Sequence, residues 1–129
     1  MRFEVRTAHD AKKALEHFNH FHDGYLETLA VRVVSENPFG FGEPLRYQVE
    51  LQLVHDNFPA CTREQQRIAL RFRDVVGLRV NDFVPLDAKM QGSTIVVDAE
   101  GVLRFDLNGD SDVTFAARSL TIEEVEAPR

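Results

Sequence analysis

Two spacings of hydrophobic residues divide the chain into a short helical part and a long β part. Ala11 and Leu15 lie one helical turn apart, with charged residues on the other face of the same segment. Thr7 and Asp10 have the spacing of a capping box, with Asp in the place of the usual Glu or Gln. The pattern predicts a helix over about residues 8–18.

The rest of the chain alternates between apolar and polar residues, which is typical of strands with one buried face. Residues 45–53 show this most completely, because every odd position is apolar and every even position is polar. A strand over 25–34 would have Val31 and Val33 on one face and Arg32 on the other. The runs that predict strands are 1–6, 25–34, 45–53, 67–80, 95–97, 102–107 and 113–122.

Local breaks in these runs suggest how the strands bend and turn. Gly77 interrupts the run 67–80, which is either one long strand that bends there or two short strands. Asn108 and Gly109 lie between two alternating runs, as in a tight hairpin. The apolar positions change parity between Ala117 and Leu120, which suggests a bulge or a bend from one sheet to another.

These elements predict a mainly β (α+β) fold in a single domain, residues 1–129, with an acidic tail that frays over 123–129. Short connections favour antiparallel neighbours. We expect six or seven antiparallel strands in a curved sheet or a two-sheet sandwich, with the N-terminal helix closing one side. The residues expected in the core are Leu51, Leu70, Phe72 and Phe105.

Composition and charge narrow the classes of function. The formal net charge is −6, which argues against a dedicated nucleic-acid binder. No apolar run approaches the ~20 residues that a membrane span requires. The N-terminal residues have no apolar signal region, and the single cysteine, Cys61, cannot form an internal disulfide. Together these features favour a cytoplasmic location.

The densest group of ionisable residues lies where the helix ends. If the chain is extended there, His20 and His22 project from one face beside Asp23, and these three could bind a divalent metal such as zinc. A fourth ligand would have to come from elsewhere, with His17 among the candidates. The alternative is structural: the histidines end the helix, where a partly positive side chain is favourable. No other cofactor motif is present.

Two further groups are candidate partner-binding sites. Arg67, Arg71 and Arg73 share the polar face of one strand, within residues 61–80, where five arginines oppose two acidic residues. Either they form cross-strand pairs with acidic strands, or the face is uncovered and binds an acidic partner or a phosphate. Phe39 and Phe41 alternate with glycines in a loop. Either they fold onto the edge of the core, or they form an apolar contact in an interface.

Two short runs carry a resemblance to known domains. Residues 21–24 read Phe-His-Asp-Gly before the first long strand, and this run resembles the start of several small bacterial domains of unknown function. Residues 68–78 are similar to a mid-chain strand of the same kind of domain. Some β-rich domains with this general sequence pattern are immunity proteins that neutralise bacterial toxins. The resemblance implies an uncharacterised bacterial protein and assigns no catalytic residue.

Two hypotheses of function follow from these residues. The first is a non-enzymatic module that binds another protein or a second copy of itself, as a homodimer, through an exposed sheet edge or the Phe39–Phe41 loop. The second is a metal-assisted or histidine-dependent enzyme that uses His20, His22 and Asp23. The absence of a recognisable nucleophile–base pair or cofactor motif favours the first hypothesis.

Overall fold

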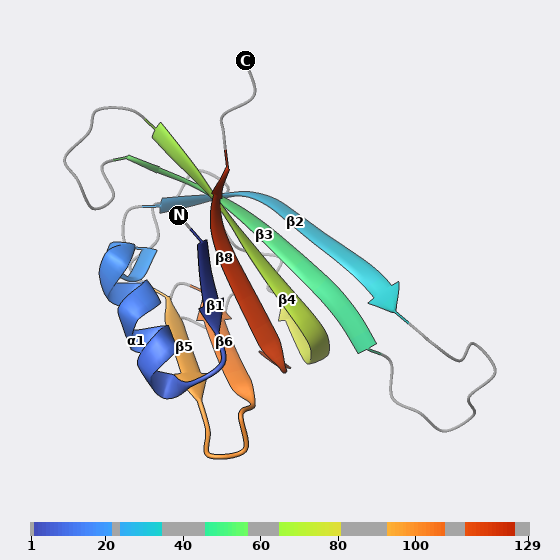
Figure 1. The fold of residues 1–129 in the computed structure, drawn as a ribbon. Helices are drawn as coiled ribbons and strands as arrows, with labels where there is room; N and C mark the ends of the chain where they lie inside the picture. The colour runs from blue at the N-terminus through green and yellow to red at the C-terminus, as the bar shows by residue number, and fades with distance from the viewer. Residues whose placement is uncertain are drawn as a thin grey trace.

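The computed structural model describes residues 2–21, 24–34, 46–56, 65–80, 93–107 and 113–125. These residues form one α-helix, one 3₁₀ turn and eight strands, drawn in Figure 1. The elements are β1 (Arg2–Val5), α1 (Ala8–His17), the 3₁₀ turn η1 (Asn19–Phe21), β2 (Gly24–Val34), β3 (Arg46–Asp56), β4 (Gln65–Val80), β5 (Thr94–Val97), β6 (Leu103–Leu107), β7 (Val113–Ala117) and β8 (Ser119–Val125).

The helix begins as its sequence predicts. The hydroxyl of Thr7 accepts a hydrogen bond from the Asp10 amide at 3.1 Å. The Asp10 carboxylate in turn accepts from the amides of Thr7 and Arg6, each at 3.1 Å. This reciprocal capping box satisfies amides that have no partner within the helix. The predicted range of 8–18 is confirmed, with Phe18 as the C-terminal cap.

A sharp turn ends the helix and fixes the aromatic residues beneath it. His20 and Phe21 have positive φ angles of 56° and 57°, a left-handed conformation that few non-glycine residues adopt. The turn places the ring of Phe21 parallel to that of Phe18, with centroids 5.6 Å apart, and both side chains are fully buried. Burial of these rings offsets the backbone strain.

The strand β4 joins two antiparallel sheets into one curled half-barrel (Figure 1). Its first part lies between β3 and β8 in the order β2-β3-β4-β8-β1, and its last part pairs with β7 in the order β4-β7-β6-β5. The bend follows Asp74 (φ 53°) and includes Gly77 (φ 68°). The run 67–80 is therefore one long bent strand, and glycine suits the bend because it has no Cβ.

The core lies between the two halves of the curled sheet. The ring of Phe72 on β4 lies 4.8 Å from that of Phe105 and 4.6 Å from that of Phe115, which belong to β6 and β7. Leu51 and Leu70 are also fully buried, so all four predicted core residues are confirmed. The helix contacts β1 and β5, the outer strands of the two halves, and so closes one side.

The sequence-based fold class is confirmed, with two differences. The described residues contain eight strands rather than six or seven, because β7 and β8 are separate strands on either side of Arg118. The prediction that the tail frays from residue 123 is wrong for residues 123–125. These are the last residues of β8, and they pair with β4. The predicted Asn108–Gly109 turn lies outside the described residues.

Within the described part of the chain, no helix is long and apolar enough to cross a membrane.

Substitution of Phe72 by alanine tests the aromatic contact between the two halves. We expect the free energy of unfolding in urea to fall by about 3–5 kcal/mol, because the change leaves a cavity against two other rings. Val96→Ala, at a position that is 57% exposed, should cost less than about 0.5 kcal/mol. A loss below about 1 kcal/mol for Phe72→Ala would contradict this packing.

The capping box makes stability depend on pH. The hydrogen bond from the Arg6 amide, followed by those from Thr7, lowers the pKa of the Asp10 carboxyl. Its stabilising contribution is therefore complete above the unfolded pKa of about 4 and is lost as the pH falls through the lower folded value.

Asp10→Ala should remove this contribution. The wild type should therefore have the larger free energy of unfolding near neutral pH, and the difference between the two proteins should shrink as the solution is acidified. Lys12→Ala, exposed on the same helix, should keep the pH dependence of the wild type. A constant difference between Asp10→Ala and wild type down to about pH 2 would contradict the role given to the carboxylate.

Candidate functional site

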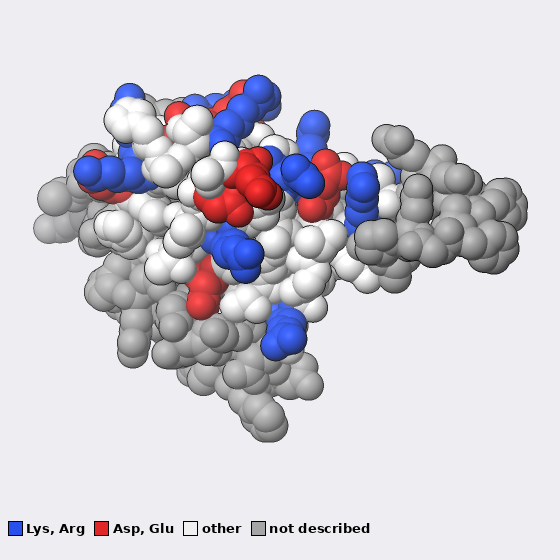
Figure 2. All heavy atoms as spheres, turned by 90° about the horizontal axis from the view of Figure 1, so that it is seen from below, with Lys and Arg blue, Asp and Glu red and all other residues white. Residues whose placement is uncertain are grey.

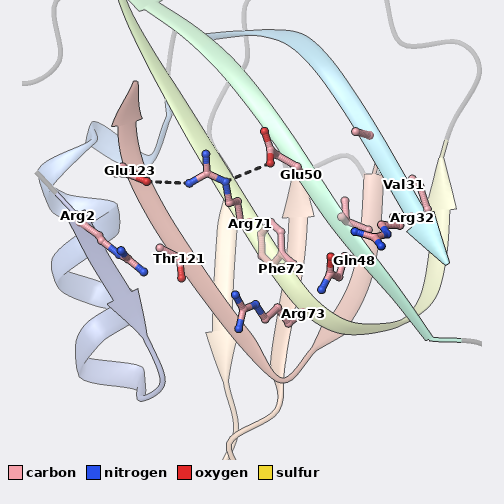
Figure 3. Close-up of a pocket in the computed structure, with 12 residues that line it drawn as sticks. Arg2, Val31, Arg32, Gln48, Glu50, Arg71, Phe72, Arg73, Thr121 and Glu123 are labelled. Atoms are coloured by element: carbon pink, nitrogen blue, oxygen red, sulfur yellow. Dashed lines mark hydrogen bonds and ion pairs between the residues drawn. The ribbon is translucent and has the colours of Figure 1, made fainter. Parts of the chain in front are cut away.

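A hollow of about 470 Å³ lies on the outer, polar face of the sheet β2-β3-β4-β8-β1 (Figure 3). We call it the arginine hollow. Alternate residues of each strand point away from the core, and most of the outward residues that line the hollow are polar. Four arginines and two glutamates line it, a formal excess of two positive charges. The lining residues used below are Arg2, Arg32, Gln48, Glu50, Arg71, Arg73 and Glu123.

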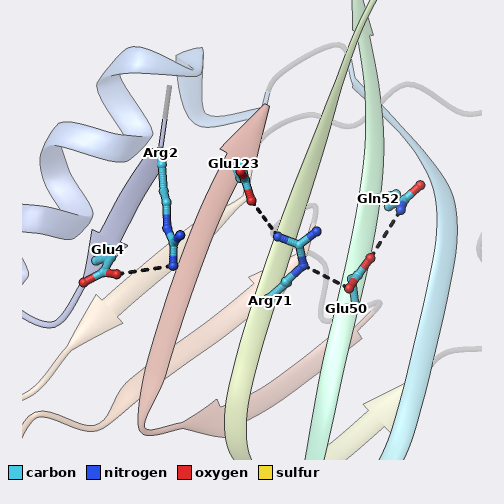
Figure 4. A network of polar contacts seen from close by, with 6 residues as sticks. All are labelled: Arg2, Glu4, Glu50, Gln52, Arg71 and Glu123. Atoms are coloured by element: carbon cyan, nitrogen blue, oxygen red, sulfur yellow. Dashed lines mark hydrogen bonds and ion pairs between the residues drawn. The ribbon is translucent and has the colours of Figure 1, made fainter. Parts of the chain in front are cut away.

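Arg71 is held at the centre of the hollow by two carboxylates (Figure 4). Its Nε donates to Glu50 at 3.1 Å and its Nη1 donates to Glu123 at 2.8 Å. Glu50 also accepts from Gln52 at 3.2 Å. The hydrogen bond to Glu123, and then that to Glu50, raise the pKa of Arg71. Both glutamates of the hollow are thus already engaged by one guanidinium.

Arg67 is also paired within the protein. Its Nε donates to both carboxylate oxygens of Glu27 on β2, at 3.1 and 3.3 Å. Of the three arginines predicted to form a binding face, Arg67 and Arg71 therefore form cross-strand ion pairs, which is one of the two alternatives for this strand. Arg73 is exposed and has no carboxylate partner among the described residues.

Arg73 lies in one row with Gln48 and Arg32. Arg32 on β2 is directly opposite Gln48 on β3, and Gln48 lies opposite the bulge that β4 forms between Phe72 and Val75. In Figure 3 the two arginine side chains lie on either side of Gln48. Arg32 is exposed and, within the described part of the chain, it too has no carboxylate partner.

The nearest acidic residue along β4, Asp74, forms no ion pair with this row. Asp74 lines a different hollow, together with Arg46 and Arg118. On the face drawn in Figure 2, the basic and acidic groups of the described residues are interleaved. The row Arg32–Gln48–Arg73 is therefore a local positive site on a protein whose formal net charge is −6.

The predicted metal site is only partly described. His20 is exposed in the turn η1, and its backbone carbonyl accepts a hydrogen bond from the Ser93 amide at 2.8 Å. His22 and Asp23 lie outside the described residues, so the metal site stays a prediction. Among the side chains that are described, no group of three His, Cys, Asp or Glu residues is arranged to hold a metal ion.

His17 serves the packing of the helix. Its ring lies 5.0 Å from that of Phe3 and 4.7 Å from that of Phe18. The distance from its Nε2 to Glu124 Oε1 is 3.9 Å, which suits an ion pair only when the ring is protonated. His17 thus packs among the aromatic rings at the end of the helix.

The predicted Phe39–Phe41 contact and Cys61 also lie outside the described residues. The sequence did predict the face on which Arg32 lies, but gave no reason to group it with Arg73. Only the pairing of β2, β3 and β4 brings these two residues, 41 positions apart in the sequence, into one row.

A second candidate surface is the free edge of β2. This strand has 11 residues and pairs only with β3 among the described elements. Val31 and Val33 share the inward parity of the buried Val49, yet they are 45% and 56% exposed. On the side away from β3, β2 therefore presents apolar side chains and backbone groups that no other described strand pairs with.

Comparison of the chain with models of protein families, with curated proteins and with solved structures finds no match in any of the three. The resemblance of residues 21–24 and 68–78 to small bacterial domains therefore stays a prediction.

Removal of Arg71 tests the central ion pairs of the hollow. Arg71→Ala leaves Glu50 and Glu123 without their shared cation, and we expect a loss of about 1 kcal/mol in unfolding free energy, since all three side chains are more than a third exposed. The loss should shrink in about 1 M salt. Arg104→Ala, exposed on β6, should have little effect, and an equal loss in both variants would contradict the assignment.

Proposed function

We propose that the protein is a binding module that associates with a second copy of itself by antiparallel pairing of the two β2 strands. The observation that supports this most directly is the long edge of β2, with two exposed valines and one hydrogen-bonding side free of other described elements. A strand of another chain that adds to such an edge gains a row of backbone hydrogen bonds and covers apolar surface.

The side chains of β2 are complementary to those of a second β2. In an antiparallel pair, residues directly opposite each other lie on the same face of the sheet. If Val31 lies opposite Val31 of the second copy, Val33 lies opposite Leu29 at both ends of the pair. This register joins the exposed apolar residues of the two strands into one stripe. Because the pair has a two-fold axis, both chains make the same contacts.

Charge does not oppose this arrangement. The β2 segment contains one acidic residue, Glu27, and one basic residue, Arg32, so its formal net charge is zero. Glu27 is already paired with Arg67. Two copies of β2 can therefore approach without the repulsion that the net charge of −6 imposes on other parts of the surface.

The other two edge strands among the described elements, β1 and β5, are less suited to pairing. Each has only four residues, and α1 contacts both. Natural sheets commonly limit edge pairing by shortening or covering the edge strand. This contrast makes β2 the preferred edge and supplies a matched control position, Val96 on β5, which is 57% exposed.

The experiment is to measure the mass of the wild-type protein in solution over a range of concentrations by light scattering. We expect a concentration-dependent dimer for the wild type and a monomer for Val31→Lys, because two lysines would then lie opposite each other on the two-fold axis. Val96→Lys adds the same charge on the edge strand β5, and this variant should remain dimeric.

Two results would overturn the proposal. One is a wild-type protein that stays monomeric at concentrations up to about 1 mM, because a dissociation constant above this value corresponds to very weak association. The other is a dimer that Val31→Lys leaves intact, which would assign the contact to another surface, including the Phe39–Phe41 segment. Thermal unfolding of each variant shows whether the substitution has changed the fold rather than the contact.

A further inference from the structure

We infer that the row Arg32–Gln48–Arg73 in the arginine hollow binds carboxylates of an extended acidic segment of a partner protein. All three side chains are exposed and belong to three adjacent strands of one chain. The inference concerns the polar face of the sheet and does not require the dimer proposed for the β2 edge.

The donors of this row suit carboxylates. Each guanidinium offers a planar fork of N–H groups that can bind one carboxylate through two parallel hydrogen bonds. The Gln48 amide between them offers two further N–H donors. The carboxylates that line the hollow do not compete for these donors, because Glu50 and Glu123 are held by Arg71.

The spacing of the row suits an extended segment better than one small anion. Arg32 and Arg73 are two strand spacings apart, ~10 Å between their backbones. An extended chain rises ~3.3 Å per residue, so acidic residues two or three positions apart can reach the two guanidiniums together. The hollow is a depression on an exposed sheet face, and a single small ion there would be screened by solvent on its open side.

The charge of the molecule argues for a short acidic segment rather than a nucleic acid. Of the four arginines that line the hollow, Arg2 and Arg71 have glutamate partners. Only Arg32 and Arg73 then have guanidinium groups without a carboxylate partner among the described residues. A net charge of −6 repels a long polyanion over its whole length, whereas a short segment meets mainly the local excess of positive charge. Phosphate backbones are usually bound by many more basic contacts than this.

Asp74, the acidic residue that follows Arg73, lines the neighbouring hollow with Arg46 and Arg118 and is not among the residues that line the arginine hollow. It forms no ion pair with Arg32 or Arg73.

The experiment measures binding of a fluorescent hexaglutamate peptide by anisotropy at low salt, with hexaglutamine as the uncharged probe. We expect hexaglutamate to bind, hexaglutamine not to bind, and the double variant Arg32→Gln/Arg73→Gln to weaken hexaglutamate binding about tenfold or more. The matched control is Arg79→Gln/Arg104→Gln, which removes two exposed arginines that line a hollow on the other sheet and should bind as the wild type does.

Three outcomes would overturn the inference. The control double variant could lose as much affinity as the test variant, which would indicate general charge attraction. Inorganic phosphate or a short DNA oligonucleotide could bind more tightly than the peptide, which would identify a different ligand class. Binding could also strengthen with added salt, the sign expected when repulsion by the net charge dominates. Titrations at protein concentrations below those at which light scattering detects a dimer separate this result from that of the proposed dimer.

Discussion

The long strand β4 is the constraint on which the other features of this fold depend. It provides hydrogen bonds to β3, β8 and β7, so both halves of the curled sheet share its backbone. The positive φ angles of Asp74 and Gly77 allow it to turn from one half into the other. The Arg118 amide donates to the Arg73 carbonyl at 3.0 Å and keeps the returning chain paired at the bend. The aromatic core then fills the angle that this bend creates.

The bend also determines which surfaces stay open. The first half has five strands in the order β2-β3-β4-β8-β1, whereas the second adds only β7, β6 and β5 beyond β4. The helix lies between β1 and β5, at the opposite end of the sheet from β2. As a result the inward-facing valines of β2 have no described layer over them, and among the described elements only β3 pairs with this strand.

The same strand organises the charge on the polar face. Its alternate residues place Arg67, Arg71 and Arg73 on one side of the sheet. Among the described residues, Glu27 on β2, Glu50 on β3 and Glu123 on β8 pair with the first two arginines only. Arg73 lies at the bulge, where β3 presents Gln48 and β2 presents Arg32. An open apolar edge and a local positive row therefore lie on adjoining parts of one sheet, and both properties follow from the order of its strands.

The sequence by itself determined the elements and their faces, because local spacing controls them. The Thr7–Asp10 capping box and the burial of Leu51 and Phe72 each depend on residues close together in the chain. The sequence left open whether Gly77 bends one strand or separates two, and the structure shows one bent strand. Only the tertiary structure decided that β2 is an edge strand and that Arg32 and Arg73 share a row. Strand order depends on contacts between distant segments, and a strand at an edge has the same alternation as a strand inside a sheet.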